Sequence, residues 1–237
     1  MVSFIVPAYN EELELSSTLA AIQAATFGLS QPFEIVVVDD ASTDATPKIA
    51  EQAGARVVSI HRRQIAAARN AGARAARGEY LFFVDADTRV NPTHIAEAIA
   101  ALKAGYTGGS ARVLMDGFVP LWGRVFLRAF SFLYFGLNLG AGAFLFTMRR
   151  NFEAVGGFDE QHFAGEEVYF SLALRKLGRF KVLKEAVLTS GRKLRMYSAK
   201  EILGTLFIMI VGGPRMARSR ARLRLWYDGK REGDAAY

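Results

Sequence analysis

The sequence predicts an α/β protein whose sheet is doubly wound and mostly parallel. Three observations favour this fold class: apolar segments alternate with segments of helical periodicity, the apolar segments lack the alternation of a half-exposed strand, and acidic residues directly follow two of them. Strands that alternate with helices favour a parallel sheet with helices on both faces, and such strands are apolar on both sides. Ligands of these sheets bind at the carboxyl ends of the strands, where the acidic residues lie.

The first half of the chain contains four expected strands with a helix in each interval. The strands are expected at 3–8, 33–38, 56–60 and 80–84, and the helices at 10–25, from about 43 onward, and at 64–76. In the first helix, Leu15, Leu19 and Ile22 recur at three- and four-residue spacing, as on one helical face. Ser42 or Thr43 is expected to cap the second helix, because a short side-chain oxygen can accept a hydrogen bond from a backbone N–H of the first turn.

The second half of the chain alternates less regularly. We expect a helix at 93–103, a strand at 109–115, a helix at 168–177 and a strand at 182–188. Residues 129–148 form a run of twenty without a charge, which is long enough for a membrane span. Asn138 and the neighbouring glycines argue against a span, so we expect an aromatic amphipathic helix around 126–134 and then a strand at 143–148.

Composition and charge limit the kind of protein. The chain has 237 residues, enough for one α/β domain, and it has no cysteine, which excludes disulfides and thiolate sites. Residues 214–231 hold seven basic residues and one acidic residue, and so carry most of the net charge of +7. Such a segment binds phosphate-rich surfaces: anionic lipid, nucleic acid, or the acidic edge of its own domain. We therefore expect a folded domain at 1–213 and a basic C-terminal segment at 214–237.

Three aspartates follow the expected strands. Asp40, Asp85 and Asp87 should meet at one edge of the sheet. Neighbouring carboxylates repel one another unless a cation lies among them, and magnesium or manganese can bridge one or two carboxylates to phosphate oxygens. The pattern predicts a metal-dependent enzyme acting on a nucleotide diphosphate. A receiver-like signalling module, which also carries paired acids after a strand, is the alternative from another class.

Six segments in register resemble the family-2 glycosyltransferases. They are FIVPAYNEE (4–12), VDDASTDAT (38–46), ARNAG (68–72), GEYLFFVDAD (78–87), GGFDE (156–160) and GEEVYFSLALRKLG (165–178). The resemblance implies a GT-A fold over 1–213, a nucleotide-diphosphate sugar as donor, a divalent metal (Mn²⁺ or Mg²⁺) and inversion of the anomeric carbon. The chain has no glutamine-x-x-arginine-tryptophan motif after these segments, which argues against a chain-elongating synthase.

The resemblance assigns the donor site residue by residue. The residues that would line the base pocket or lie at the nucleotide are Pro7, Ala8, Tyr9, Glu11 and Asp40. Asp85, Ala86 and Asp87 match the motif that bridges ribose, metal and diphosphate, and Asp87 is expected to coordinate the metal directly. Arg69 matches a position near the nucleotide, although a structural tether to the sheet is equally consistent with the motif.

Two further positions concern the chemical step. Relatives carry an acid followed by a general-base aspartate, and this chain has Glu166 and Glu167 there. We expect Glu167 to be the base, with Glu166 as the alternative; a charge that stabilises the helix N-terminus is the structural interpretation. Arg192, after the strand at 182–188, is expected either to bind the donor diphosphate, where it would stabilise negative charge, or to lie in a surface loop.

The sequence thus predicts a metal-dependent inverting glycosyltransferase. The expected acceptor is a hydroxyl group of a glycan or lipid-linked molecule; the alternatives are polyprenyl phosphate, which needs no base, and a non-catalytic sugar-nucleotide-binding module. The first residues are typical of a strand rather than of a signal peptide, which predicts a cytoplasmic chain. The basic segment predicts contact with an anionic membrane on its inner face and no nucleic acid partner; folding back over the donor phosphates is the competing role.

Overall fold

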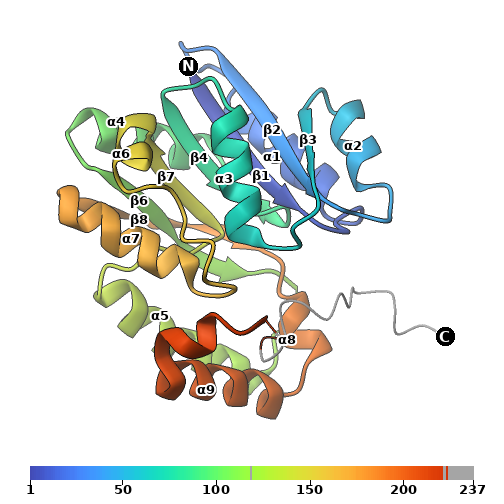
Figure 1. Cartoon of the computed structure of the whole chain (residues 1–237), viewed down its shortest axis with the longest axis vertical. Coiled ribbons are helices and arrows are strands. Elements are labelled where there is room, and N and C mark those ends of the chain that lie inside the picture. Colours follow the sequence, from blue (N-terminus) through green and yellow to red (C-terminus); the bar gives the residue numbers. More distant parts are fainter. Residues whose placement is uncertain (118, 221–222, 224–237) are drawn as a thin grey trace.

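The computed structural model describes residues 1–117, 119–220 and 223, which form a mixed sheet with helices on both faces (Figure 1). The strands are β1 (Val2–Ala8), β2 (Phe33–Asp40), β3 (Arg56–Ile60), β4 (Tyr80–Val84), β5 (Thr88–Arg89), β6 (Gly108–Met115), β7 (Phe144–Met148) and β8 (Phe180–Thr189). The helices are α1 (Leu15–Ala25), α2 (Thr46–Gln52), α3 (Ile65–Ala75), α4 (Pro92–Lys103), α5 (Leu121–Gly136), α6 (Arg149–Ala154), α7 (Glu166–Leu177), α8 (Arg192–Met196) and α9 (Ala199–Ala217).

The sheet has a parallel half and a mixed half. Its strand order is β3-β2-β1-β4-β7-β6-β8-β5, and the first four strands in this order pair in parallel. β7 is antiparallel to both β4 and β6, whereas β6 and β8 pair in parallel. The predicted alternation of strands and helices is confirmed for the parallel half, and it brings the carboxyl ends of β1, β2 and β4 to one edge.

Alternate residues of the central strands face two separate cores. Phe4 and Phe82 belong to the core under α1 and α4, whereas Ile5 and Phe83 belong to the core under α3 and α7. All four side chains are fully buried. Burial on both faces explains why these strands lack the polar–apolar alternation of a half-exposed sheet. Each fully buried side chain of this size contributes roughly 1.5–3 kcal/mol of hydrophobic free energy.

The alanine-rich helix α3 lies close to the sheet because its inward residues are small. A Cβ atom on Gly72 would collide with the side chains of Ile5 and Val38. The small residues of the segment ARNAG therefore have a packing role. They allow α3 to approach β1 and β2, and this approach carries the side chain of Arg69 toward the carboxyl edge of the sheet.

The predicted cap of the second helix is wrong. α2 begins at Thr46, and its N-cap residue is Ala45, whose side chain forms no capping hydrogen bond. Ser42 and Thr43 instead join the loops after β1 and β2: the Asn10 N–H donates to Ser42 Oγ at 3.0 Å, and the Thr43 N–H donates to Asn10 Oδ1 at 2.8 Å. Serine and threonine side chains that can cap a helix can equally form hydrogen bonds between loops. Here Ser42 and Thr43 bind Asn10 of the neighbouring loop instead of the first turn of α2.

The long apolar stretch is a helix followed by a strand, as predicted. α5 ends at Gly136 and β7 begins at Phe144, and no helix among the described residues is long and apolar enough to cross a membrane. Together with α8 and α9, α5 forms a helical layer beside the carboxyl edge of the sheet (Figure 1). A small hydrophobic core lies within this layer. Its buried residues are Val119, Leu194, Tyr197 and Ile202.

The expected domain boundary falls within α9. Gly213 has a φ of 53° and a ψ of −145°, which interrupts the helical geometry of α9 at the residue where we placed the end of the folded domain. The basic segment expected at 214–237 lies outside the described residues beyond Arg220, apart from Leu223. The extent of this segment therefore stays a prediction.

Candidate active site

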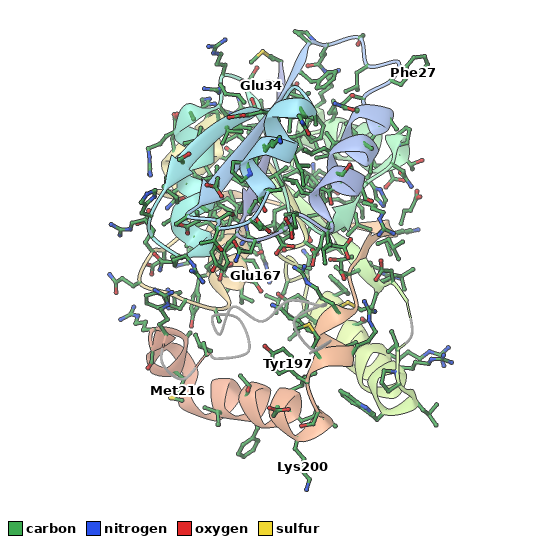
Figure 2. All side chains as sticks on the ribbon, turned by 90° about the vertical axis from the view of Figure 1, so that its right-hand side faces the viewer. Phe27, Glu34, Glu167, Tyr197, Lys200 and Met216 are labelled. Carbon is green, nitrogen blue, oxygen red and sulfur yellow. The ribbon has the colours of Figure 1, made fainter. Side chains whose placement is uncertain are left out.

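The candidate site lies where β1, β4 and β8 end and α7 begins. Figure 2 shows Glu167 at the edge of the sheet that faces α9, with Phe27 and Glu34 at the opposite end of the molecule. Residues from five segments that are distant in the sequence meet here through hydrogen bonds and ion pairs. They are Glu11, Arg69, Asp85, Asp87, Glu166 and Arg192.

The segment Asp85-Ala86-Asp87 follows β4 and is held by its neighbours. The Asp85 N–H donates to the carbonyl of Ala143 at 3.1 Å, and the Thr18 hydroxyl donates to the carbonyl of Ala86 at 2.8 Å. The Thr189 hydroxyl donates to Asp87 Oδ1 at 3.1 Å. Burial raises the pKa of Asp85, an effect that the charge of Arg69 opposes and that of Asp87 reinforces. The two carboxylates are thus fixed side by side, two residues apart.

Arg69 connects this segment to α7. Its Nη2 atom lies 2.9 Å from Asp85 Oδ1, and its Nη1 atom lies 2.6 Å from Glu166 Oε1; Nη2 also donates to the carbonyl of Gly142. The side chain is 1% exposed. Burial disfavours its charge, but Asp85 and Glu166 raise the pKa of Arg69 overall. Arg69 was expected either to lie near the nucleotide or to act as a structural tether to the sheet. These contacts are the ones expected of a tether, and direct contact with a nucleotide stays a prediction.

Glu166 and Glu167 begin α7 but have different surroundings. Gly165, with a φ of 71°, precedes them as the N-cap residue. Glu166 is buried in the ion pair with Arg69, whereas Glu167 forms no salt bridge with any residue in the described part of the chain. Burial, reinforced by the charge of Glu166, raises the pKa of Glu167 to about 8. Adjacent carboxyl groups whose environments separate them in this way are typical of acid–base assignments in active sites.

Tyr134 of α5 lies near these two glutamates and was not predicted as a site residue. Its hydroxyl donates to the carbonyl of Gly140 at 2.8 Å. Burial raises the pKa of Tyr134, and the charges of Glu167 and Glu166 raise it further. In the sequence it stands in an aromatic helix outside the six segments, so no motif marks it.

Arg192 joins the acidic edge from α8. Its guanidinium binds both oxygens of Glu11 at 2.6 and 2.7 Å and lies 3.1 Å from Asp87 Oδ2. The neighbouring Lys193, which the sequence did not mark, shares this environment: burial lowers its pKa, and the charge of Asp87 opposes that shift. Arg192 is therefore part of the acidic cluster rather than of a surface loop.

Asp40 makes its contacts elsewhere along the same edge. Its carboxylate accepts hydrogen bonds from three successive backbone N–H groups, those of Arg62, Arg63 and Gln64, each at 2.7 Å. The guanidinium of Arg63 lies 3.2 Å from the centre of the Tyr9 ring, beside the end of β1 that contains Pro7 and the buried Ala8. A base pocket at these residues stays a prediction.

The three aspartates do not form a bare group of carboxylates, and the binding of a metal among them stays a prediction. Every one of the three aspartates already has partners in the protein: backbone N–H groups at Asp40, Arg69 at Asp85, and Thr189 with Arg192 at Asp87. The sequence marked the acids and, separately, Arg69 and Arg192, but it did not predict that these arginines, from α3 and α8, compensate the charge of Asp85 and Asp87. Only the folded chain brings these residues together.

Comparison with known proteins identifies the family. The model of the family "Glycosyl transferase family 2" matches residues 3–185. An undecaprenyl-phosphate 4-deoxy-4-formamido-L-arabinose transferase from Aeromonas hydrophila is 32% identical over 113 residues, which are 45% of this chain and 35% of that protein. The chain therefore spans about a third of the length of the curated relatives it matches.

Two solved structures show the same fold. The mannosyltransferase PcManGT from Pyrobaculum calidifontis, in complex with GDP-Man and Mn²⁺, has a TM-score of 0.70 at 21% identity, covering 96% of this chain and 68% of that one. S. aureus TarS 1-349 in complex with UDP-GlcNAc has a TM-score of 0.63 at 21% identity, covering 89% and 65%. The receiver-like alternative is wrong, because the family match spans both acidic segments and the start of α7. The chain belongs to glycosyl transferase family 2 and has the GT-A fold.

Proposed function

We propose that this chain is a metal-dependent inverting glycosyltransferase that moves a sugar from a nucleotide-diphosphate sugar to an acceptor at a membrane surface. One observation carries the proposal: Arg69 holds the end of Asp85-Ala86-Asp87 against the start of α7, where Glu167 lies. This arrangement sets two carboxylates suited to a metal and diphosphate beside a third with a raised pKa. The solved neighbours in complex with nucleotide sugars support the donor class.

The residues at this edge fit a divalent cation. The side chains of Asp85 and Asp87 are 27% and 17% exposed, and carboxylate oxygens are the preferred ligands of Mn²⁺ and Mg²⁺. The described residues contain no group of three or more His, Cys, Asp or Glu that could hold a metal ion, so diphosphate and water oxygens would complete the coordination, as in many nucleotide sites. A cation held there would neutralise charge on the departing diphosphate.

The other donor contacts follow the edge of the sheet. Pro7, Ala8 and Tyr9 end β1 beside Arg63 and would border the nucleobase together with Asp40. Glu11, which Arg192 links to Asp87, and Ala86 would border the ribose and diphosphate. Arg192 would stabilise negative charge on the diphosphate. Arg69 would act through Asp85 and Glu166, which it positions.

Glu167 would remove the proton from an acceptor hydroxyl. With a pKa of about 8, the Glu167 carboxylate is a stronger base than an ordinary carboxylate, and the fraction available to accept a proton grows as the pH rises toward 8. Glu166 is less suited to this step, because its Oε1 atom already forms an ion pair with Arg69 Nη1 at 2.6 Å. The extra methylene of glutamate relative to the aspartate of relatives extends the carboxyl group further from α7.

The acceptor is a hydroxyl group or a polyprenyl phosphate. The names of the curated relatives favour the second, since they act on undecaprenyl phosphate. A phosphate acceptor is already ionised and would make Glu167 dispensable as a base. A catalytically silent binder of sugar nucleotides is the remaining alternative, and turnover of any donor excludes it.

A thermal-shift screen with sugar nucleotides and Mn²⁺ tests the donor assignment. A ligand that binds only the folded chain raises its stability by about 2.7 kcal/mol at a hundred times its Kd. We expect one nucleotide family to raise the melting temperature with Mn²⁺ and to have little effect with a chelator. If no nucleotide diphosphate or sugar nucleotide shifts the melting temperature, the proposed function is wrong.

The charge and surface of residues 190–237 favour a membrane contact. Residues 190–237 hold eleven basic and four acidic residues, which is the whole net charge of +7. On α9, Leu203, Phe207 and Ile208 are 41%, 66% and 47% exposed, and Lys200 lies exposed on the same helix (Figure 2). Apolar and basic residues that share a helix are typical of segments lying in the interface of an anionic bilayer.

Sedimentation with vesicles tests this contact. We expect the full chain to bind phosphatidylglycerol vesicles but not phosphatidylcholine vesicles, and to release them at high salt, because each basic residue near the surface contributes about 1 kcal/mol. Truncation after Gly213 and Phe207→Asp should both weaken binding. Phe27→Asp is the matched control, since Phe27 is 91% exposed at the opposite end of the molecule.

The competing role of the basic segment gives a different result. If these arginines fold over the donor phosphates, the truncated chain would still bind vesicles but would lose affinity for the nucleotide. That outcome would overturn the membrane assignment and place the segment in the donor site.

A further inference from the structure

Arg192 contacts the aspartate that the proposed function assigns to the metal. Its Nη2 atom lies 3.1 Å from Asp87 Oδ2, while the other oxygen of Asp87 accepts the Thr189 hydroxyl at 3.1 Å. The same guanidinium binds Glu11 through both oxygens. Both oxygens of Asp87 therefore already have partners within the protein.

These charges lie where water screens them weakly. The side chains of Arg192, Glu11 and Asp87 are 12%, 10% and 17% exposed. Carboxylates so little exposed are costly to leave unpaired, and a pair of this kind is strongly destabilised when one partner is removed. Arg192 is thus a resident counter-ion that contacts both Asp87 and Glu11, with Lys193 also in the field of these two carboxylates.

We propose that Arg192 competes with the divalent cation for Asp87, so that the site takes the cation together with the donor diphosphate rather than by itself. The inference rests on the proposed function. A cation that arrives alone must either displace Arg192 from Asp87 or place a second positive charge beside it. A diphosphate removes this conflict, because its oxygens offer the planar guanidinium a new bidentate partner.

The local backbone allows the exchange to occur by rotation of one side chain. The Gly191 N–H donates to Asp116 Oδ1 at 3.0 Å, and Leu194 is buried in the small core with Val119 and Tyr197. These contacts hold α8 on both sides of Arg192. The guanidinium can therefore leave Asp87 for a neighbouring phosphate while α8 stays in place.

Calorimetric titration of the full chain tests the competition with two probes: Mn²⁺ alone, and UDP or GDP in the presence of Mn²⁺. Arg192→Gln should bind Mn²⁺ alone about tenfold more tightly than the parent chain, while binding the nucleotide about tenfold more weakly; each change corresponds to about 1.4 kcal/mol. Opposite signs are expected because the arginine opposes the cation and attracts the diphosphate. A residue that only supports the fold would not separate the two affinities in this way.

Two further variants make the result decisive. Glu11→Gln leaves Arg192 with Asp87 as its main partner, and should weaken binding of Mn²⁺ alone. Arg56→Gln is the matched control: this arginine pairs with Glu34 at 3.0 Å at the opposite edge of the sheet, and its loss should change neither affinity.

The proposal fails if Arg192→Gln binds Mn²⁺ alone no better than the parent chain while its melting curve shows a folded protein. If Arg192→Gln does not fold, the Glu11→Gln titration decides, and unchanged binding of Mn²⁺ overturns the proposal. If the parent chain binds neither UDP nor GDP, the proposed function loses its support, whereas the titrations with Mn²⁺ alone still test the competition.

Discussion

Glu167→Gln is expected to lower the rate of transfer to a hydroxyl acceptor by roughly a hundred- to ten-thousand-fold, the usual range for loss of a general base. The amide keeps the shape of the side chain but cannot accept the proton. Affinity for the donor should change little, because Glu167 forms no ion pair with Arg69 or with any other residue in the described part of the chain. Steady-state kinetics with saturating donor, together with calorimetry of donor binding, measure the two effects separately.

Glu166→Gln is the matched comparison for this variant. It removes a partner of the buried Arg69, so we expect it to lower stability as well as activity. Normal turnover by Glu167→Gln would mean that Glu166 is the base or that the acceptor is a phosphate. An assay with both acceptor classes distinguishes these outcomes, since transfer to a phosphate acceptor needs neither glutamate as a base.

The raised pKa of Glu167 provides a second measurement on the same variant. The pKa is about 8 in the folded chain against an ordinary value of 4.5, so the folded state binds this proton more tightly than the unfolded state. The resulting stabilisation is fully present below about pH 4.5 and is lost as the pH rises to about 8. Relative to Glu167→Gln, the parent chain should lose on the order of a few kcal/mol over this range. Urea denaturation of both proteins at several pH values measures the difference, and Glu153→Gln, at an exposed ion pair, is the control.

Asp87→Ala is expected to remove most of the affinity for a nucleotide diphosphate. The substitution deletes the carboxylate assigned to the metal, and it also frees Arg192 to pair with Glu11 alone. A loss of about a hundredfold or more corresponds to roughly 2.7 kcal/mol, and a chelator should have a similar effect on the parent chain. Calorimetry with and without chelator measures both losses.

The combination of the two treatments is the informative control. Once Asp87 is absent, the chelator should cause little further loss, because both treatments remove the same interaction. Undiminished binding in the variant and with chelator would contradict the assignment of Asp85-Ala86-Asp87 to the metal and diphosphate.

Much of the parallel half of the fold could be predicted because its signals are local. The strand β4 and the acids after it follow one another directly in the sequence, and burial on both faces leaves a continuous apolar run. The division of the uncharged stretch into α5 and β7 was also predictable, since Asn138 and the glycines lie between them. The cap of α2 was not, because Ser42 has an equally good partner in Asn10, a residue 32 positions away.

The site was predictable only in part, because many of its contacts join residues that are far apart in the sequence. The sequence marks the carboxylates at strand ends and also Arg69 and Arg192, but it does not show which arginine pairs with which carboxylate: Arg69 comes from the middle of an alanine-rich helix and Arg192 from a short helix beyond the sheet. Tyr134 approaches the glutamates from an aromatic helix outside every recognisable segment. Such contacts depend on how α3, α5 and α8 pack, which no local pattern specifies.

The single arginine between Asp85 and Glu166 also limits how this protein can be changed. Because one buried cation serves both carboxylates, a substitution at either end leaves the other with an altered partner, and breaking a buried pair of this kind typically costs about 3–5 kcal/mol. The segment Asp85-Ala86-Asp87 and the start of α7 are therefore expected to change together in evolution. Exploration of new acceptors, in evolution or in the laboratory, is expected to have most freedom on the outer surfaces of α5 and α9, which border the site without sharing that arginine.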